Sequence, residues 1–198
     1  SNMSTEQSRV YQALIDTVSD TEEDDWHIIY SDNVSSNLLM PSLVHPNDTS
    51  IVPSEFAYFA RIAKKSLYDS NPEWAFIYLE QNENAEAVLN TNLASFIEGE
   101  RSEAFLIVNL TETILCETTA TRWDEETVQY IRNNGQVEEK IMRVASYVMF
   151  TYKDWFGFVG SNNFTPDVDE ISSILCNNLS SIIDKNSPPK ASFDIYPP

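Results

Sequence analysis

The sequence predicts an α+β domain in which helices pack on an antiparallel or mixed β-sheet of about five strands, with a long helix near the C-terminus. Segments rich in aromatic and β-branched residues occupy the middle of the chain, whereas amphipathic patterns typical of helices occur near both ends. At 198 residues the chain is long enough for one good-sized core. We therefore expect one acidic domain over residues 3–186, followed by a Pro-rich tail at 187–198.

The N-terminal segment predicts a helix that ends near Ser19, because its apolar residues recur at a spacing of four. The stretch "WHIIYSD" then alternates as a strand does, which places Trp26 and Tyr30 on one face. Residues 32–53 contain three prolines and are compatible with loops and one short extended piece. The apolar residues of the predicted helix are Val10, Leu14 and Val18.

A helix, a strand and a second helix are predicted next. Ser54 is a suitable N-cap, and the apolar spacing after it predicts a helix over residues 55–70. The segment "EWAFIYLEQ" is apolar on both sides and predicts a strand with both faces covered. A short helix follows over residues 85–99, ended by Gly99.

Residues 104–123 are rich in β-branched side chains and predict one long strand, or two strands joined by a bend near Asn109. A helix is expected to open at Trp123-Asp124, where acidic residues suit the helix dipole, and to end at "NNG". The segment "VEEKIMRVASYVMF" is compatible with a helix or with a strand from about Ala145.

The C-terminal elements are a strand pair and a helix. The aromatic segment "YVMFTYKDWFGFVG" predicts two antiparallel strands around Lys153-Asp154. Thr165 caps the last helix, Pro166 takes its first position, and the helix ends near Asp184. Its apolar stripe consists of Val168, Ile171, Leu175, Leu179 and Ile182.

The cysteines and the absence of export signals predict a cytoplasmic protein. Cys116 and Cys176 lie in apolar stretches, where a free cysteine behaves as a small buried hydrophobe, so no disulfide is expected. No apolar run approaches the length of a membrane helix, and the N-terminus lacks the layout of a signal peptide.

The charge is strongly negative, with a formal net charge of −19. No Lys or Arg occurs between Arg9 and Arg61, and residues 66–100 also lack a basic side chain. Such a chain has no basic stripe for nucleic-acid phosphates, so direct nucleic-acid binding is not expected. A basic protein partner is favoured electrostatically, and the alternative is that the acidity serves solubility or adaptation to salt.

No motif predicts a metal site, a cofactor or a catalytic residue. The acidic turn at residues 20–25 resembles the start of a calcium loop, but Asp25 and Ser31 stand where that loop needs Gly and Glu. His27 and His45 lack the spacing of a zinc site. The chain has no Gly-rich nucleotide loop and no nucleophile motif, and Gly160–Asn163 reads as an ordinary strand-to-helix loop.

The sequence therefore favours a non-enzymatic protein that captures or inhibits a basic protein partner, for example an immunity protein that neutralises a toxin. A secretion chaperone and a nucleic-acid mimic would use the same acidic surface. The alternative is a hydrolase-type enzyme whose carboxylates and histidine converge only in the folded chain. The residues expected to contact the partner are Asp20, Glu22, Glu23, Asp24, Asp25, Trp26, Tyr30 and Asp32.

Overall fold

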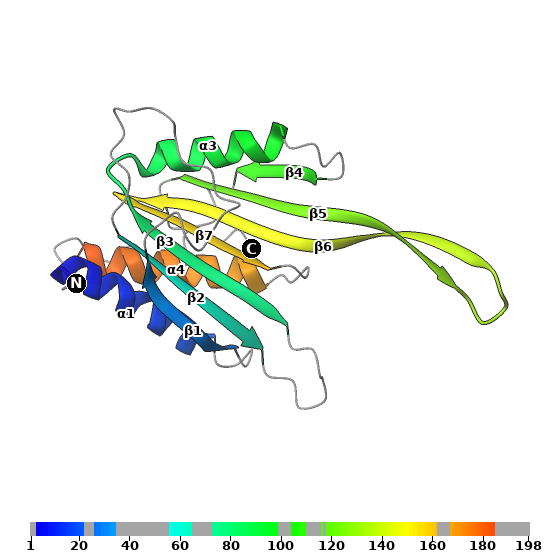
Figure 1. The fold of residues 1–198 in the computed structure, drawn as a ribbon, viewed down its shortest axis with the longest axis horizontal. Coiled ribbons are helices and arrows are strands. Elements are labelled where there is room, and N and C mark those ends of the chain that lie inside the picture. Colours follow the sequence, from blue (N-terminus) through cyan, green and yellow to red (C-terminus); the bar gives the residue numbers. More distant parts are fainter. Residues whose placement is uncertain are drawn as a thin grey trace, which may run out of the picture.

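The structure is a computed structural model that describes residues 3–21, 26–34, 56–64, 73–98, 104–109, 116, 118–161 and 167–184. Within these ranges it contains three helices and seven strands (Figure 1). The predicted α+β class is confirmed. In chain order the elements are α1 (Thr5–Asp20), β1 (Trp26–Val34), β2 (Phe56–Lys64), β3 (Trp74–Gln81), α3 (Ala85–Glu98), β4 (Ala104–Asn109), β5 (Thr118–Ile131), β6 (Val137–Tyr152), β7 (Trp155–Ser161) and α4 (Asp167–Ile183).

The strands of the described chain form one sheet in the order β1-β2-β3-β7-β6-β5-β4. Every neighbouring pair is antiparallel, so the sheet is antiparallel rather than mixed. Its seven described strands exceed the number expected from the sequence, in part because a segment predicted to be helical is a strand.

That segment is β2, and the prediction of a helix over residues 55–70 was wrong for the part that the structure describes. β2 lies between β1 and β3, and side chains on both of its faces are buried: Ala57 on one face and Tyr58 on the other are each at most 1% exposed. When both faces of a strand are covered, apolar residues lose the alternation that distinguishes a strand from a helix. Ser54, the predicted N-cap, lies outside the described residues.

The helix predicted to begin at Trp123-Asp124 was also wrong, because β5 continues through this segment and β6 is a strand over its whole length. The turn between β5 and β6 is closed by hydrogen bonds from Arg132 N to Gln136 O and from Gly135 N to Arg132 O, each 2.8 Å long. Gly135 has a φ of 81°, which glycine adopts without strain. The Asn-Asn-Gly sequence therefore closes a hairpin instead of ending a helix.

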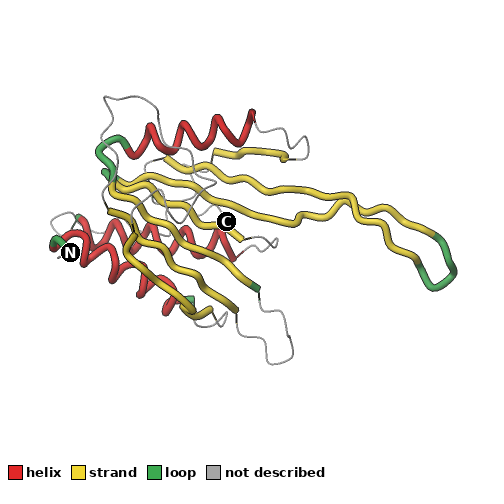
Figure 2. Tube along the Cα trace, in the orientation of Figure 1, coloured by secondary structure: helices red, strands yellow, loops and turns green. Residues whose placement is uncertain are grey.

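Helices cover both faces of the sheet, but unequally. α1 and α4 pack side by side on one face, and α3 packs on the other face over β6 and β7 (Figure 2). We call these the two-helix face and the one-helix face. The core of the two-helix face includes Phe150 and Trp155, and the core of the one-helix face includes Tyr78, Leu89 and Phe156.

The described parts of helices α1 and α4 follow the sequence-based predictions, while the predicted cap Thr165 and first helical residue Pro166 lie outside the described residues. The side chain of Ser4 accepts a hydrogen bond from the Gln7 backbone at 3.1 Å, and the Gln7 side chain accepts one from the Ser4 backbone at 2.9 Å. This capping box explains why α1 begins at Thr5. The predicted stripes are buried at Val10, Leu14 and Val18 in α1 and at Val168, Ile171, Leu175 and Leu179 in α4, and Ile182 is partly buried.

The expectation of two free cysteines was wrong. Cys116 and Cys176 form a disulfide with a Cα–Cα distance of 5.6 Å, which links the segment after β4 to α4. Both residues are buried, as predicted. An apolar neighbourhood in the sequence suits a buried thiol and a buried disulfide equally, and only the folded chain brings the two residues together.

Candidate functional site

Those of the predicted partner-contacting residues that the structure describes do not form one surface. Residues 22–25 lie outside the described chain. Asp20 is the exposed last residue of α1, where it accepts a hydrogen bond of 3.3 Å from Asn178 of α4. Tyr30 and Asp32 are exposed on β1, whereas Trp26 on the same strand is 3% exposed.

A β-bulge in β1 separates Trp26 from Tyr30. Ile28 pairs with Ile62 of β2, but Tyr30 pairs with Arg61, so the register shifts between them. The extra residue of a bulge moves the following side chains to the opposite face. Trp26 therefore lies in the core of the two-helix face and Tyr30 on the one-helix face, and the prediction that they share a face was wrong.

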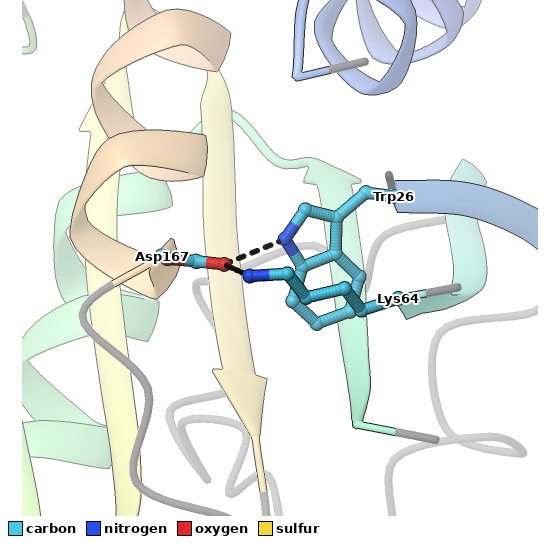
Figure 3. A network of polar contacts seen from close by, with 3 residues as sticks. All are labelled: Trp26, Lys64 and Asp167. Atoms are coloured by element: carbon cyan, nitrogen blue, oxygen red, sulfur yellow. Dashed lines mark hydrogen bonds and ion pairs between the residues drawn. The ribbon is translucent and has the colours of Figure 1, made fainter. Parts of the chain in front are cut away.

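Trp26 joins the sheet to α4 (Figure 3). Its indole Nε1 donates a hydrogen bond of 2.9 Å to Oδ2 of Asp167, and Nζ of Lys64 lies 3.0 Å from the same oxygen. These side chains come from the first residue of β1, the last of β2 and the first of α4, where the helix dipole favours a carboxylate. A partner cannot reach the Trp26 ring in this arrangement, so Trp26 is part of the core rather than of a binding surface.

After the bulge, aromatic side chains form a continuous row across the one-helix face. The ring centroids are 6.5 Å apart for Tyr30 and Phe59, and 6.3 Å apart for Phe59 and Phe76. They are 5.2 Å apart for Phe76 and Phe158, and 5.8 Å apart for Phe158 and Tyr147. The row crosses β1, β2, β3, β7 and β6, and these separations are typical of aromatic contacts. The exposed fraction falls from 47% at Tyr30 to 2% at Phe158, which packs with α3.

Polar groups surround the exposed end of this aromatic row. The Tyr30 hydroxyl donates a hydrogen bond of 3.0 Å to Oδ2 of Asp32, and this bond raises the pKa of the Tyr30 phenol. Arg61 pairs with Tyr30 and places its guanidinium carbon 5.3 Å from the ring centroid of Trp74, which is itself 39% exposed. We call Tyr30, Asp32, Phe59, Arg61 and Trp74 the β1 site. It offers aromatic surface, a carboxylate and a cation that is stacked on an indole.

The strand that carries the β1 site is at one border of the sheet (Figure 1). Within the described residues β1 pairs with β2 alone, so its other edge directs backbone N–H and C=O groups away from the sheet. Ile29, beside the bulge, is 45% exposed. An extended segment of another protein can pair with such an edge while its alternate side chains contact the adjoining face.

The other sequence-based candidates do not add a second site. His27 is exposed on β1, and His45 lies outside the described residues. Ser161, at the end of β7, donates its hydroxyl to the Trp74 carbonyl at 2.5 Å, so it serves the sheet. Within the described ranges no three His, Cys, Asp or Glu side chains gather as metal ligands, and no helix is long and apolar enough to cross a membrane.

A pair of carboxyls lies near the N-terminus of α1. The Gln81 side chain donates hydrogen bonds of 3.3 Å to Glu6 and 3.1 Å to Asp154. Burial, and then the charge of Asp154, raise the pKa of the Glu6 carboxyl. A hollow of about 420 Å³ lies at the tip of the β5–β6 hairpin, away from this pair of carboxyls. The residues that line the hollow are Ile131, Arg132, Asn133 and Asn134.

Comparison with known proteins adds no functional information. No protein-family model and no curated protein matches the chain. A solved structure from Mycobacterium smegmatis, described as a putative uncharacterized protein, aligns with a TM-score of 0.31 and 6% identity over 85% of this chain and 96% of that chain. This degree of similarity carries no argument, so the interpretation of the β1 site depends on its own geometry.

Three members of the β1 site were missed from the sequence, namely Phe59, Arg61 and Trp74. Phe59 and Arg61 alternate along β2 with period two, which was a readable signal, but the predicted helix concealed it. The row itself depends on the pairing of strands that are far apart in the sequence, and no single segment contains that information.

Proposed function

We propose that this chain is a non-enzymatic binding protein that captures a basic, extended segment of a partner protein at the β1 site. One observation carries the proposal: an aromatic row emerges at an edge strand, where Tyr30 is 47% exposed beside the exposed carboxylate of Asp32. The net charge of −19 supports the proposal because it attracts a basic partner over long distances.

The β1 site suits an extended segment better than a globular surface. Backbone groups of the segment would pair with the outer edge of β1, as in other cases of strand addition. Alternate side chains would then lie on the one-helix face, where an apolar residue packs on Tyr30 and Phe59 and a basic residue meets Asp32. The guanidinium of Arg61 disfavours a second basic residue near Trp74.

An immunity protein that neutralises a basic toxin is one function of this class, and a secretion chaperone is another. Both would use the β1 site in the same way. A cytoplasmic location belongs to this proposal as a prediction, and the Cys116–Cys176 disulfide counts against it because disulfides persist mainly in oxidising compartments.

The proposal is tested by titrating the isotope-labelled full chain with a short peptide of alternating Lys and Val and recording amide NMR shifts. We expect shifts concentrated on β1, and weaker binding at high salt because screening shortens the attraction. Asp32→Asn should weaken binding several-fold, whereas the matched variant Asp16→Asn, which removes a carboxylate from α1, should not. Shifts spread over the whole chain, or equal losses in both variants, would contradict the proposal.

The acidic residues immediately before β1 provide a second test, on association rate. Replacing Glu22, Glu23, Asp24 and Asp25 by their amides should leave the fold intact and slow binding of the same peptide by about tenfold at low salt, because charges near a site steer encounter. Stopped-flow measurements give the rate. An unchanged rate would place the contact away from the start of β1.

A further inference from the structure

The β5–β6 hairpin extends beyond the rest of the sheet. In the described chain, β4 pairs with β5 as far as Asp124, and β7 pairs with β6 from Ser146 onward. Past these points residues 125–131 and 137–143 pair only with each other, and the hairpin projects away from the helices (Figures 1 and 2). We call residues 125–143 the arm.

The side chains of the arm that the structure describes are exposed, apart from the half-buried Glu138. Tyr130 is 41%, Ile131 74% and Val137 60% exposed, although all three are large apolar residues. Thr127 and Lys140 are exposed as well. A two-stranded ribbon is at best marginally stable in water, and exposed apolar side chains add to the cost. The arm therefore suits a state in which another surface covers part of it.

One edge of the arm is complementary to itself. Among the described residues no strand lies beside β6 from Val137 to Ala145, a stretch with the sequence "VEEKIMRVA" that contains acids and bases. The outer edge of β5 within the arm, "EETVQYI", contains two acids and no base. Only the β6 edge can therefore place opposite charges beside each other when it meets its own copy.

We propose that two copies of this chain associate through their arms, by antiparallel pairing of the two β6 edges about a two-fold axis. β6 has a bulge at Val144, because Asp124 pairs with Ala145 but Glu125 pairs with Arg143. Overlap of the regular stretch 139–143 with the same stretch of a second copy puts Ile141 on the axis. Glu139 then stands opposite Arg143 of the second copy, and the symmetry repeats this pair. Lys140 stands opposite Met142, so no like charges face each other within this stretch.

The distribution of charge also favours contact through the arm. Four acids and three bases occur in residues 125–143, so the arm carries −1 of the net −19. Two copies that meet through their arms keep their strongly acidic parts apart, which reduces repulsion. An isologous contact of this kind closes a two-fold dimer and leaves the β1 site free, so the inference is independent of the proposed function.

The test is a charge exchange followed by sedimentation equilibrium and light scattering. In solution the wild-type protein should have twice the mass of a single chain, which is 22.6 kDa. Arg143→Glu creates two pairs of facing acids and should weaken the dimer by about tenfold or more. The double variant Glu139→Arg/Arg143→Glu restores opposite charges and should recover most of the affinity. Arg9→Glu makes the same change of charge at an exposed position of α1, away from the arm, and is the matched control.

Cross-linking checks the position of the axis in a way that does not depend on charge. Ile141→Cys should give a disulfide-linked dimer on mild oxidation, because residue 141 meets itself at the axis. Thr127→Cys is the control, because Thr127 pairs with Ile141 within one hairpin and lies on the far strand. A wild-type monomer at about 0.1 mM, equal effects of Arg9→Glu and Arg143→Glu, or equal cross-linking at both positions would overturn the proposal. Circular dichroism establishes that each variant is folded.

Discussion

Aromatic side chains are buried to different extents on the two faces of the sheet. On the two-helix face α1 and α4 cover the strands, and Trp155 and Phe150 are fully buried. On the one-helix face α3 covers β6 and β7, and the aromatic row becomes more exposed toward β1. On the two-helix face these aromatic residues are core, whereas on the one-helix face they are core near α3, as Phe156 and Phe158 are, and surface at Tyr30. Trp26 and Tyr30, four residues apart on β1, belong to these two categories because of one bulge.

The largest expected change in stability on the two-helix face comes from the Cys116–Cys176 disulfide. Reduction of the Cys116–Cys176 disulfide, which spans 60 residues, should lower the free energy of unfolding by about 4 kcal/mol, because the unfolded chain is no longer restricted. Urea unfolding with and without reductant measures the change. The double variant Cys116→Ser/Cys176→Ser should match the reduced protein and not respond to reductant. If reductant does not change the free energy of unfolding of the wild type, the disulfide is contradicted.

Two glycines of β7 compare the faces directly. A Cβ at Gly157 would overlap the ring of the fully buried Phe150, whereas a Cβ at Gly160 would lie 2.6 Å from Cζ of Phe76 and 2.7 Å from Cδ1 of Tyr147. Phe76 and Tyr147 are half-buried, so their rings have room to shift. Gly157→Ala should therefore cost about 3 kcal/mol of unfolding free energy and Gly160→Ala about 1 kcal/mol. Urea unfolding gives both values, and equal costs would refute the difference between the faces.

The same contrast applies within β1. Trp26→Phe keeps an aromatic ring but removes the hydrogen bond to Asp167, and should cost about 2 kcal/mol because that bond has a charged acceptor. Tyr30→Phe removes the hydrogen bond to Asp32 on the exposed side and should leave the free energy of unfolding unchanged within error. Thermal or urea unfolding compares the two. A loss of stability in Tyr30→Phe as large as that in Trp26→Phe would show that Tyr30 belongs to the core.

The contrast between covered and open faces also explains which helices and strands could be predicted correctly from the sequence. α1 and α4 each bury one side, so their stripes, such as Val10 and Leu14, repeat with the helical period. β2 is covered on both sides, and its apolar residues suggested a helix. The arm was predicted to be a helix over its first strand and was left open between helix and strand over its second. Its described side chains on both strands are exposed or half-buried, so they give no alternation between a covered and an open side.

The candidate site was predictable in part. The acidic charge and the exposed strand pointed to Tyr30 and Asp32, and both lie in the β1 site. Trp26 was assigned to the same face because alternation along "WHIIY" takes no account of a bulge, whose extra residue changes the face of every side chain after it. Phe59 and Trp74 come from other strands, and their nearness to Tyr30 follows from the pairing order of the sheet.

The smallest expected effect on stability concerns the carboxyl of Glu6, in the first turn of α1. The pKa of Glu6 is raised in the folded chain from its ordinary 4.5, so the folded state binds this proton more tightly than the unfolded state. Its contribution to stability is therefore greatest below the ordinary pKa and falls as the pH rises through the raised value. Glu6→Gln cannot ionise, and should stabilise the chain at neutral pH by no more than about 0.5 kcal/mol, because the group is largely solvated.

Urea unfolding of the Glu6→Gln variant near pH 4 and at neutral pH tests this sign. The gain should be present at neutral pH and shrink toward pH 4, where wild-type Glu6 is largely protonated. Glu86→Gln, at an exposed position of α3, controls for the loss of one negative charge from a chain of net charge −19. If Glu6→Gln is less stable than the wild type at neutral pH, the hydrogen bond from Gln81 to the Glu6 carboxylate outweighs the cost of placing that charge beside Asp154.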